Sequence, residues 1–364
     1  MAETSVRELE AILLVGGQGT RLRPLTIGTP KPLLPTAGVP FLAHQLAQAR
    51  AAGVRRIVFA TSYRAEMFCE AFGDGSAFGL TLEYVTEETP LGTGGAIRNA
   101  AEALTCGPDA PVVVLNGDIL SGHDIADQVA RHVERGAALT LHLTEVEDPS
   151  RFGCVPTDDE GRVTAFLEKT PNPVTNRINA GCYVFTRSVI DTIPAGEVVS
   201  VERETFPGLI EAGALVLGYA DASYWLDVGT PAAFVQGSRD LVLGRLPSPA
   251  LPGPAGDLLA LPGAVISPEA KVCEGTAVGA RAAVHAGAKV TGSVLGDDCV
   301  VESEAIVADS VVGAGARVAS GAVLRGAVVG DGAVVGPGNE LLAGSRVWPG
   351  VVLPECAVRF SSDV

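Results

Sequence analysis

Residues 13–35 read LLVGGQGTRLRPLTIGTPKPLLP, an apolar run followed by a glycine-rich turn, two arginines and a lysine between two prolines. The chain carries a formal charge of −16, yet residues 11–65 contain seven Arg and Lys and no Asp or Glu. Glycines leave backbone N–H groups unobstructed, and an arginine fork matches phosphate oxygens. The stretch therefore predicts an anion site, and we expect its ligand to be a nucleoside triphosphate.

Lysine usage points to the same stretch. The chain has 22 Arg and only four Lys, and Lys31 and Lys169 are the only lysines before residue 264. Lysine supplies a compact charge on a flexible stem, which the planar guanidinium of arginine does not. We therefore expect roles for both lysines, with two stray surface lysines as the alternative.

Length and charge bound the class of protein. A chain of 364 residues should form about two domains. A pI near 4.7 argues against nucleic acid or an anionic membrane as a partner, because both require a basic face. The seven cysteines are far apart without a C-x-x-C pair, so we interpret them as buried, reduced thiols. No apolar run approaches the roughly 18 residues of a membrane span or resembles a signal peptide, which predicts a cytoplasmic protein.

The first two thirds of the chain alternate between continuous apolar runs and segments with helical spacing. The apolar runs predict strands at 10–15, 56–61, 80–85, 111–115 and 139–144, and the helices follow at 41–52, 64–72, from the second glycine turn to about 104, and at 125–136. This alternation predicts a Rossmann-like, doubly wound α/β sheet with its sites at the carboxyl ends of strands. Asp118 and Asp227 both follow apolar runs.

Beyond Pro149 the pattern changes to short strands, which we expect at 154–156, 163–168 and 180–185 and interpret as a substrate-binding insertion in a mixed sheet. Helices are expected at 188–193, 203–211 and 231–243. The resulting division is a catalytic domain over 1–244, a proline-rich linker over 245–263 and a repeat domain over 264–364.

The repeat domain shows an aliphatic residue at nearly every sixth position, with small residues between them. The series is Ile266, Val272, Val278, Val284 and Val290, then Val300, Ile306, Val312, Val318 and Leu324, then Val329, Val335, Leu341, Val347 and Leu353. This is the hexapeptide pattern of a left-handed parallel β-helix, with about 18 residues per coil and about five coils. The spacing slips to five near Leu295 and after Leu324.

Seven motifs carry a family resemblance. They are GGQGTRLRPLT at 16–26, PKP at 30–32, LGTGGAI at 91–97, NGD at 116–118, FLEK at 166–169, NAGCYVF at 179–185 and YWLDVGTP at 224–231. Together they resemble the sugar-1-phosphate nucleotidyltransferases. With its β-helix, the whole chain is most similar to the members that make GDP-mannose and pyrophosphate from GTP and mannose 1-phosphate. A glucose-1-phosphate nucleotidyltransferase using UTP, dTTP or ATP, or a non-catalytic regulatory homologue, is the alternative.

The resemblance implies a role for each matching position. Arg21, Lys31, Asp118, Lys169 and Asp227 would form the catalytic set, in which Asp118 and Asp227 bind Mg²⁺. The nucleotide would contact Leu13, Gly16, Gly17, Gly19, Thr20, Arg21, Glu87 and Gly92. The sugar phosphate would contact Gly153, Glu168, Lys169 and Asn179. A sugar phosphate oxygen is already an anionic nucleophile, so catalysis needs positioning and charge neutralisation rather than a general base.

Simpler interpretations stand beside several of these roles. Asp118 could be only a turn residue, and Glu168 and Lys169 only a solvated strand end. The chain has Glu-Lys-Thr-Pro where many relatives have Glu-Lys-Pro, which puts the shape of that loop in question. His285 lies in the repeats, where acyltransferases of similar repeat keep a catalytic histidine, but a lone histidine there is more often a surface residue.

The base is predicted from Glu87 and Glu88, which precede the second glycine turn. A carboxylate can accept both adjacent donors of guanine, whereas an amide suits uracil or thymine better. The acidic pair therefore favours guanine, although an exposed loop charge is the alternative and either glutamate could point inward.

The open ends and flat faces of a β-helix also predict a homo-oligomer assembled through the repeats.

Overall fold

The computed structural model describes residues 8–61, 64–170, 172–342 and 344–359. The chain divides into two compact units, of which the first comprises the chain up to Gly17 together with Gln45–Trp225. The second comprises Gln18–His44 and Leu226–Val364. This division by contacts cuts the chain at other places than residues 244 and 263, and the domain boundaries given there stay predictions.

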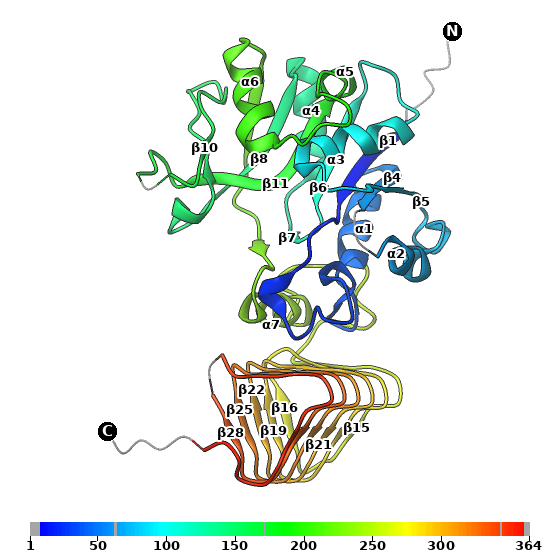
Figure 1. The fold of residues 1–364 in the computed structure, drawn as a ribbon, viewed down its shortest axis with the longest axis vertical. Coiled ribbons are helices and arrows are strands. Elements are labelled where there is room, and N and C mark those ends of the chain that lie inside the picture. The colour runs from blue at the N-terminus through cyan, green and yellow to red at the C-terminus, as the bar shows by residue number, and fades with distance from the viewer. Residues whose placement is uncertain (1–7, 62–63, 171, 343, 360–364) are drawn as a thin grey trace. The chain divides into compact units, whose positions relative to one another are not determined.

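The first unit is built on one mixed sheet of nine strands (Figure 1). Its strands are β1 Leu9–Leu14, β4 Val54–Thr61, β5 Thr81–Thr86, β6 Pro111–Asn116, β8 Leu139–Glu145, β9 Gly153–Cys154, β10 Leu167–Glu168, β11 Arg177–Thr186 and β12 Val216–Ala220. β1 pairs in parallel with both β4 and β6, and β5 continues the parallel part beyond β4. β11 runs antiparallel to β6 and β8. The predicted α/β fold with a mixed sheet is confirmed.

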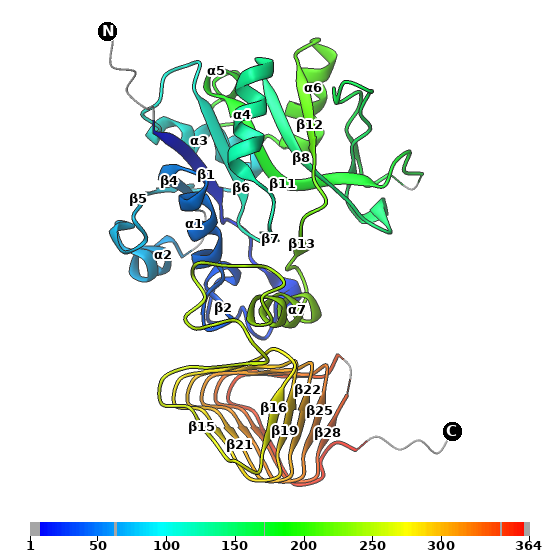
Figure 2. The same ribbon diagram turned by 180° about the vertical axis from the view of Figure 1, so that it is seen from behind.

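Helices cover both faces of this sheet. They are α1 Phe41–Ala51, which begins in the second unit, α2 Ala65–Phe72, α3 Gly92–Ala100, α4 Ile125–Arg135, α5 Arg187–Ile190 and α6 Phe206–Glu211. α3 packs on β1 and β4 and lies in front of the sheet in Figure 1, whereas α4 packs on β6 and β8 and is in front in Figure 2. The Asp124 carboxylate accepts from the Asp127 N–H at 3.0 Å and caps α4, and Gly136 ends it in the left-handed conformation.

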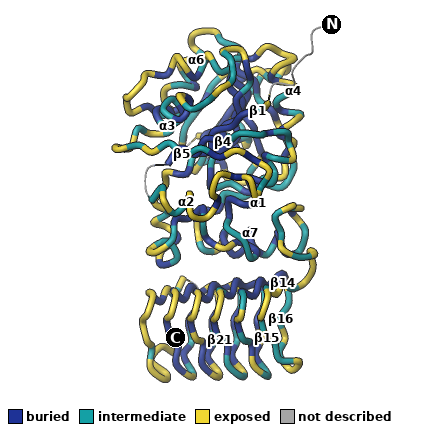
Figure 3. The backbone as a smooth tube through the Cα atoms, turned by 90° about the vertical axis from the view of Figure 1, so that its right-hand side faces the viewer, coloured by how far each residue is buried: buried dark blue, intermediate teal, exposed yellow. Residues whose placement is uncertain are grey.

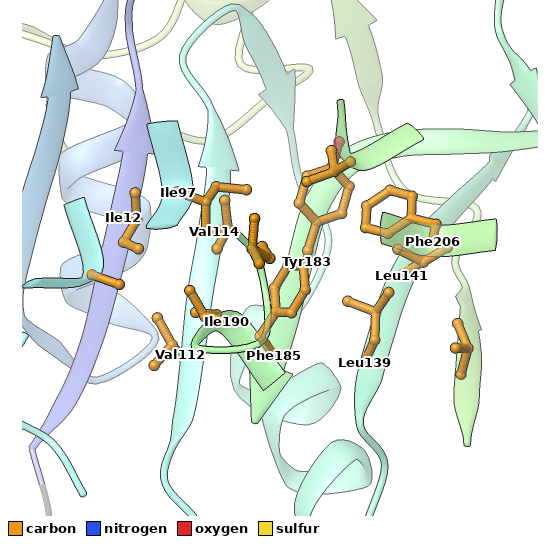
Figure 4. Packing of buried hydrophobic residues seen from close by; sticks show 14 of the residues in the cluster. Ile12, Ile97, Val112, Val114, Leu139, Leu141, Tyr183, Phe185, Ile190 and Phe206 are labelled. Carbon is orange, nitrogen blue, oxygen red and sulfur yellow. The ribbon is translucent and has the colours of Figure 1, made fainter. Parts of the chain in front are cut away.

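A large hydrophobic core lies on the face of the sheet that α3 covers. Continuous apolar strands supply it, as expected for strands buried on both faces, and β1 and β4 are drawn as buried in Figure 3. Figure 4 shows Ile12, Val114, Tyr183 and Phe206 among its members. The Tyr183 and Phe206 rings pack with their centroids 5.2 Å apart. This packing holds β11 against the short helix α6.

Two details of the sheet differ from the sequence prediction. β12 was not predicted, because its sequence VLGYA is interrupted by Gly218, whose added Cβ would lie 2.6 Å from Leu143 Cδ1. The expected strand 163–168 forms only as β10, and Val163 makes an isolated bridge to Thr157. The expected helix 203–211 begins as a π-helical turn, Val201–Thr205, before α6.

The second unit contains the loop of Gln18–His44, the helix α7 Pro231–Val242 and the β-helix. The β-helix has three parallel sheets. One consists of β14 Leu258–Ala260, β17 Thr276–Val278, β20 Val294–Leu295, β23 Val311–Val312, β26 Val328–Val329 and β29 Arg346–Val347. The next consists of β15 Val265–Ile266, β18 Ala283–Val284, β21 Val300–Val301, β24 Arg317–Val318, β27 Val334–Val335 and β30 Val352–Leu353. The third consists of β16 Lys271–Cys273, β19 Lys289–Thr291, β22 Ile306–Ala308, β25 Val323–Arg325 and β28 Glu340–Leu341.

The predicted β-helix is confirmed, and its register differs at one coil. Val301 and Val307 are fully buried and pair with Val284 and Val290, whereas Val300 and Ile306 are only partly buried. The inward position therefore moves by one residue there. Val301 and Val307 follow Val284 and Val290 by 17 residues, rather than by the 18 expected for a coil. The strand β14 lies inside the range predicted as linker and pairs with β17.

Other predictions are tested by burial. Among the described residues all seven cysteines are unpaired, but Cys69 and Cys356 are exposed, so the prediction that all are buried is wrong. His285 is exposed, as the surface interpretation requires. No helix in the described parts of the chain combines the length and the apolar character needed to cross a membrane.

The one-residue register difference can be tested by a matched pair of variants. Val301→Ala should lose about 1.5 kcal/mol of transfer free energy, plus a cavity term, because the side chain is fully buried. Val300→Ala should change the free energy of unfolding by less than about 0.5 kcal/mol, because its side chain lies on the outer surface of the coil. Calorimetric unfolding of the full chain measures both, and equal destabilisation by the two variants would contradict this register.

Candidate functional site

The glycine turn begins where β1 ends, at the centre of the parallel part of the sheet. Gly16 and Gly17 are exposed, and an added Cβ at Gly17 would meet no atom within 4 Å. Leu13, one residue before the end of β1, is fully buried, so it can meet a ligand only through its backbone. The ends of β1, β4, β5 and β6 share one edge of the sheet, because these four strands are parallel.

Asp118 lies at the same edge, two residues beyond β6. The N–H of Gly117 donates to the Leu14 carbonyl at 2.9 Å, and an added Cβ at Gly117 would lie 2.6 Å from that oxygen. Only glycine allows this approach of the two strand ends. It places the half-buried Asp118 beside the beginning of the glycine turn.

Glu87 follows β5 at this edge, and the structure distinguishes it from its neighbour. Its N–H donates to the Thr61 carbonyl at 2.9 Å, and its Oε2 accepts from the Leu91 N–H at 3.3 Å. Its Oε1 is buried and has no hydrogen-bond partner among the described residues. Burial raises the pKa of Glu87, an effect that the Leu91 N–H partly offsets. Glu88 is exposed, so Glu87 is the candidate acceptor.

The second glycine turn begins α3, but its donors are already in use. The N–H groups of Gly94 and Gly95 donate to the Val199 carbonyl at 2.8 and 3.4 Å. Gly92 is exposed and has φ of 70°, and an added Cβ there would lie 2.6 Å from the same carbonyl. The N–H groups of Gly94 and Gly95 are therefore used within the protein, and the nucleotide contact expected at Gly92 stays a prediction. Sequence could not indicate Val199, which is about a hundred residues away along the chain.

The predicted sugar-phosphate residues lie on β9, β10 and β11. Gly153 pairs with Glu168, and an added Cβ at Gly153 would lie 2.9 Å from Glu168 Oε2. Lys169 is exposed, has φ of 49°, and places Nζ 3.5 Å from Glu168 Oε1. A left-handed conformation costs a lysine about 1–3 kcal/mol, so the surrounding structure must hold this residue in place. Pro171, on which the loop prediction rested, lies outside the described residues.

Asn179 lies at a bulge of β11, and a tyrosine that sequence reasoning missed orients it. Asn179 Nδ2 donates to the Tyr183 hydroxyl at 3.0 Å, and its Oδ1 accepts from the Gly181 N–H at 3.2 Å. Asn116 Nδ2 donates to the same hydroxyl at 3.3 Å. Tyr183 is fully buried, and burial strongly raises its pKa, so it serves as a neutral anchor for two amides. The only sequence signal was a tyrosine four residues after Asn179.

The second unit holds the rest of the predicted set. Gly19 adopts the left-handed conformation with φ of 59° and precedes a 3₁₀ turn, η1 Thr20–Leu22. Lys31 is buried at 7% exposure, and its Cβ would lie 3.1 Å from a Cβ added at Gly19. Thr20 and Arg21 are exposed on the turn. The buried stem of Lys31 therefore supports the loop that carries Arg21.

Arg21 also lies beside the segment that follows Asp227. An added Cβ at Gly229 would come within 2.6 Å of Arg21 Nη2, so the guanidinium lies against the backbone there. Asp227 is half-buried at the end of β13 Trp225–Asp227. Thr230 caps α7 by accepting from the Ala233 N–H at 3.2 Å, which fixes the end of this segment.

The candidate metal ligands suit an ion that also binds phosphate. Among the described residues, no group of three or more His, Cys, Asp and Glu side chains could hold an ion. Mg²⁺ usually takes one or two carboxylates and completes its shell with water and substrate phosphates. Asp118 and Asp227 are hard oxygen donors of this kind, each half-buried in its own unit.

Comparisons with known proteins match both the α/β region and the β-helix of the chain. A family model described as nucleotidyl transferase matches residues 10–242, and one described as GlmU-like, C-terminal hexapeptide matches residues 264–345. The chain is 56% identical to a mannose-1-phosphate guanylyltransferase of Mycobacterium tuberculosis, over 99% of this chain and 100% of that one. It is 40% identical to the mannose-1-phosphate guanylyltransferase catalytic subunit beta of Drosophila pseudoobscura pseudoobscura, over 70% of each chain.

A solved structure adds a likeness of the fold. HddC from Yersinia pseudotuberculosis complexed with GMP-PN has a TM-score of 0.55 and 26% identity. The match covers 64% of this chain and 99% of that one.

The contact of Arg21 with Gly229 can be tested without changing Arg21 or the nearby Asp227. Gly229→Ala should displace the guanidinium and lower kcat/KM for the nucleoside triphosphate that the sequence predicts by about tenfold or more. The melting temperature should stay within about 2 °C, because only a flexible side chain must move. Gly107→Ala, where no atom lies within 4 Å of an added Cβ, is the control. Unchanged kcat/KM in Gly229→Ala would contradict a role for this contact.

Proposed function

This chain belongs to the nucleotidyl transferase family, and we propose that it makes GDP-mannose and pyrophosphate from GTP and mannose 1-phosphate. The observation that carries the proposal is the 56% identity to a mannose-1-phosphate guanylyltransferase over the full length of both chains. The half-buried Glu87, with an unused acceptor oxygen, supports the choice of guanine.

The reaction exchanges one phosphoanhydride bond for another. An oxygen of the sugar phosphate attacks the α-phosphorus of GTP, the bond to the β-phosphate breaks, and pyrophosphate leaves with that electron pair. The attacking oxygen is already an anion, so no side chain must remove a proton. The work of the protein is to hold two anions in line and to neutralise their charge.

Arg21 and Lys31 are proposed to hold the triphosphate. Arg21 is exposed on η1 and offers a fork of donors to phosphate oxygens. Lys31 is nearly buried below the same loop, where a compact ammonium fits and a guanidinium would need more room. Gly16, Gly17, Gly19 and Thr20 would add backbone donors to this site.

Nucleotidyl transferases generally use a divalent metal. We propose that the ion is Mg²⁺ here and that Asp118 and Asp227 bind it. When bound, the ion would neutralise charge on the phosphates. The residues themselves provide hard oxygen ligands at fixed backbone positions, Asp118 after the Gly117 contact and Asp227 before the capped helix α7.

The sugar phosphate is proposed to lie on the β9, β10 and β11 side. Lys169 would bind its phosphate, while Glu168 and Asn179 would accept or donate hydrogen bonds to sugar hydroxyls. Glu168 and Lys169 are within 3.5 Å of each other, so a phosphate on Lys169 brings the sugar near Glu168. Glycine at 153 leaves room for the Phe166 ring and the Glu168 carboxylate, since an added Cβ would lie 2.7 Å from the ring and 2.9 Å from Glu168 Oε2.

Assembly into a homo-oligomer and a cytoplasmic location complete the proposal. The outward positions of the sheet from β15 to β30 are largely aliphatic, and Val265 and Val352 are 67% and 66% exposed. A second copy of the chain could cover this face. Sedimentation equilibrium should give a mass above one chain, and a monomer at micromolar concentration would contradict the assembly.

Pyrophosphate release tests the function. GTP with mannose 1-phosphate should exceed every other pairing in a grid of GTP, UTP, dTTP and ATP against mannose and glucose 1-phosphates. Preference for glucose 1-phosphate with another base would favour the alternative enzyme. Absence of turnover with all pairings would favour a non-catalytic regulatory homologue.

Asp227→Asn should reduce kcat by about 10²-fold or more, because an amide keeps the shape of the carboxylate but not its charge. The melting temperature should be nearly unchanged. Asp118→Asn should act similarly, and the double variant should lose less than the product of both effects if the two residues share an ion. Turnover of Asp227→Asn within a few-fold of wild type would remove Asp227 from the metal site.

Glu87→Gln should lower kcat/KM for GTP by roughly ten- to a hundredfold, with a smaller loss for UTP. The exposed Glu88→Gln is the matched control and should change neither. Glu87 accepts the two guanine donors only when ionised, and burial raises its pKa. In wild type, preference for GTP should therefore be full above that pKa and fall on acidification, beginning at a higher pH than an ordinary glutamate would give. An unchanged GTP-to-UTP ratio in Glu87→Gln would contradict the assignment.

A further inference from the structure

One sheet of the β-helix presents a column of outward side chains that changes character at its last strand. The paired positions are Leu259, Ala277, Val294, Val311, Val328 and Arg346. The first five are apolar and nearly fully buried, although they point away from the coil interior. They are buried because α7 packs on β17 and β20 and the Gln18–His44 segment joins it over this sheet. Only Arg346 ends the column with a charge.

Arg346 contacts the loop that carries Arg21, the residue proposed to hold the triphosphate. Its Nη1 donates to the Arg21 carbonyl at 3.0 Å and to the Arg23 carbonyl at 2.6 Å. The turn itself uses other carbonyls, since Leu22 N–H donates to Gly19 O and Arg23 N–H donates to Thr20 O. A short 3₁₀ turn leaves its last carbonyls without partners inside the turn, and Arg346 supplies two donors to them.

The contact constrains the main chain on both sides of Leu22. Leu22 is fully buried, so the turn is anchored on its inner side by packing and on its outer side by Arg346. The Arg21 side chain, which lies against Gly229, therefore starts from a backbone position held by the β-helix.

Electrostatics make this arrangement sensitive to an anion. Arg21, Arg23 and Arg346 bring three positive charges to one turn. Like charges in one place repel each other, and a polyanion bound at the turn would relieve this repulsion.

We infer that Arg346 is a positioning residue for Arg21. By holding the η1 turn, Arg346 on the sixth strand of its sheet, β29, sets the affinity of Arg21 for the triphosphate. The inference rests on the proposed function for the identity of that triphosphate. Arg346 does not itself touch the reacting atoms. Its effect reaches the substrate through the backbone of η1.

The test compares Arg346→Met, which keeps the length of the stem without its donors, with Arg346→Lys and with Arg325→Met. Arg325 is an exposed arginine of β25, on another sheet. Arg346→Met should raise KM for GTP by about tenfold, leave KM for mannose 1-phosphate within about twofold and leave the melting temperature nearly unchanged. Arg346→Lys should restore part of the affinity, because an ammonium can donate to both carbonyls. Arg325→Met should match wild type.

Hydrogen exchange of peptides covering residues 18–30, without substrate, separates this inference from the proposed function. Exchange should be faster in Arg346→Met than in wild type, and unchanged in Arg325→Met. Unchanged exchange, or equal increases in KM for both substrates, would overturn the inference. If wild type does not use GTP with mannose 1-phosphate, the proposed function fails, while the exchange result still decides whether Arg346 holds the turn.

Discussion

The close approach of β1 and β6 at their carboxyl ends is the constraint on which the first unit depends. The Gly117 N–H meets the Leu14 carbonyl at 2.9 Å, at the point where both strands leave the sheet. The glycine turn and Asp118 begin within a few residues of this bond. A larger residue at 117 would move the glycine turn away from the Asp118 carboxylate without altering either, because its Cβ would collide with the Leu14 oxygen.

The second unit also positions charged groups, but by other contacts. In its Gln18–His44 loop, side-chain packing and single hydrogen bonds position the charged groups, because the η1 turn is not part of a sheet strand. Lys31 supports Gly19 from below, Gly229 leaves room for the Arg21 guanidinium, and Arg346 holds the outer carbonyls of the turn. Flexible side chains gain direction in this way without being buried completely, and Arg21 remains open to a ligand.

The sequence was sufficient to predict the features that follow from residue periodicity and from the order of motifs. The parallel strands were predicted because each is a continuous apolar run, and the β-helix because its six-residue repeat persists. Val300 and Val301 show where periodicity stops, since adjacent valines cannot reveal which one points inward. Tyr183 reads as an ordinary core residue in an apolar strand, and the contact of Val199 with α3 joins distant parts of the chain. Among the site residues, burial separated Glu87 from Glu88, which pattern alone could not do.

The regular stacking of the coils gives the β-helix a property that a globular domain lacks. Neighbouring strands are about 4.8 Å apart, so each coil advances the chain by one fixed step. Arg346 is on the sixth strand of its sheet, and its place opposite the η1 turn depends on the number of strands before it. Gain or loss of a single coil would carry the arginine beyond hydrogen-bonding reach while leaving the fold of every other coil intact. If Arg346 positions Arg21 as inferred, the number of coils in the β-helix determines whether the η1 turn is held.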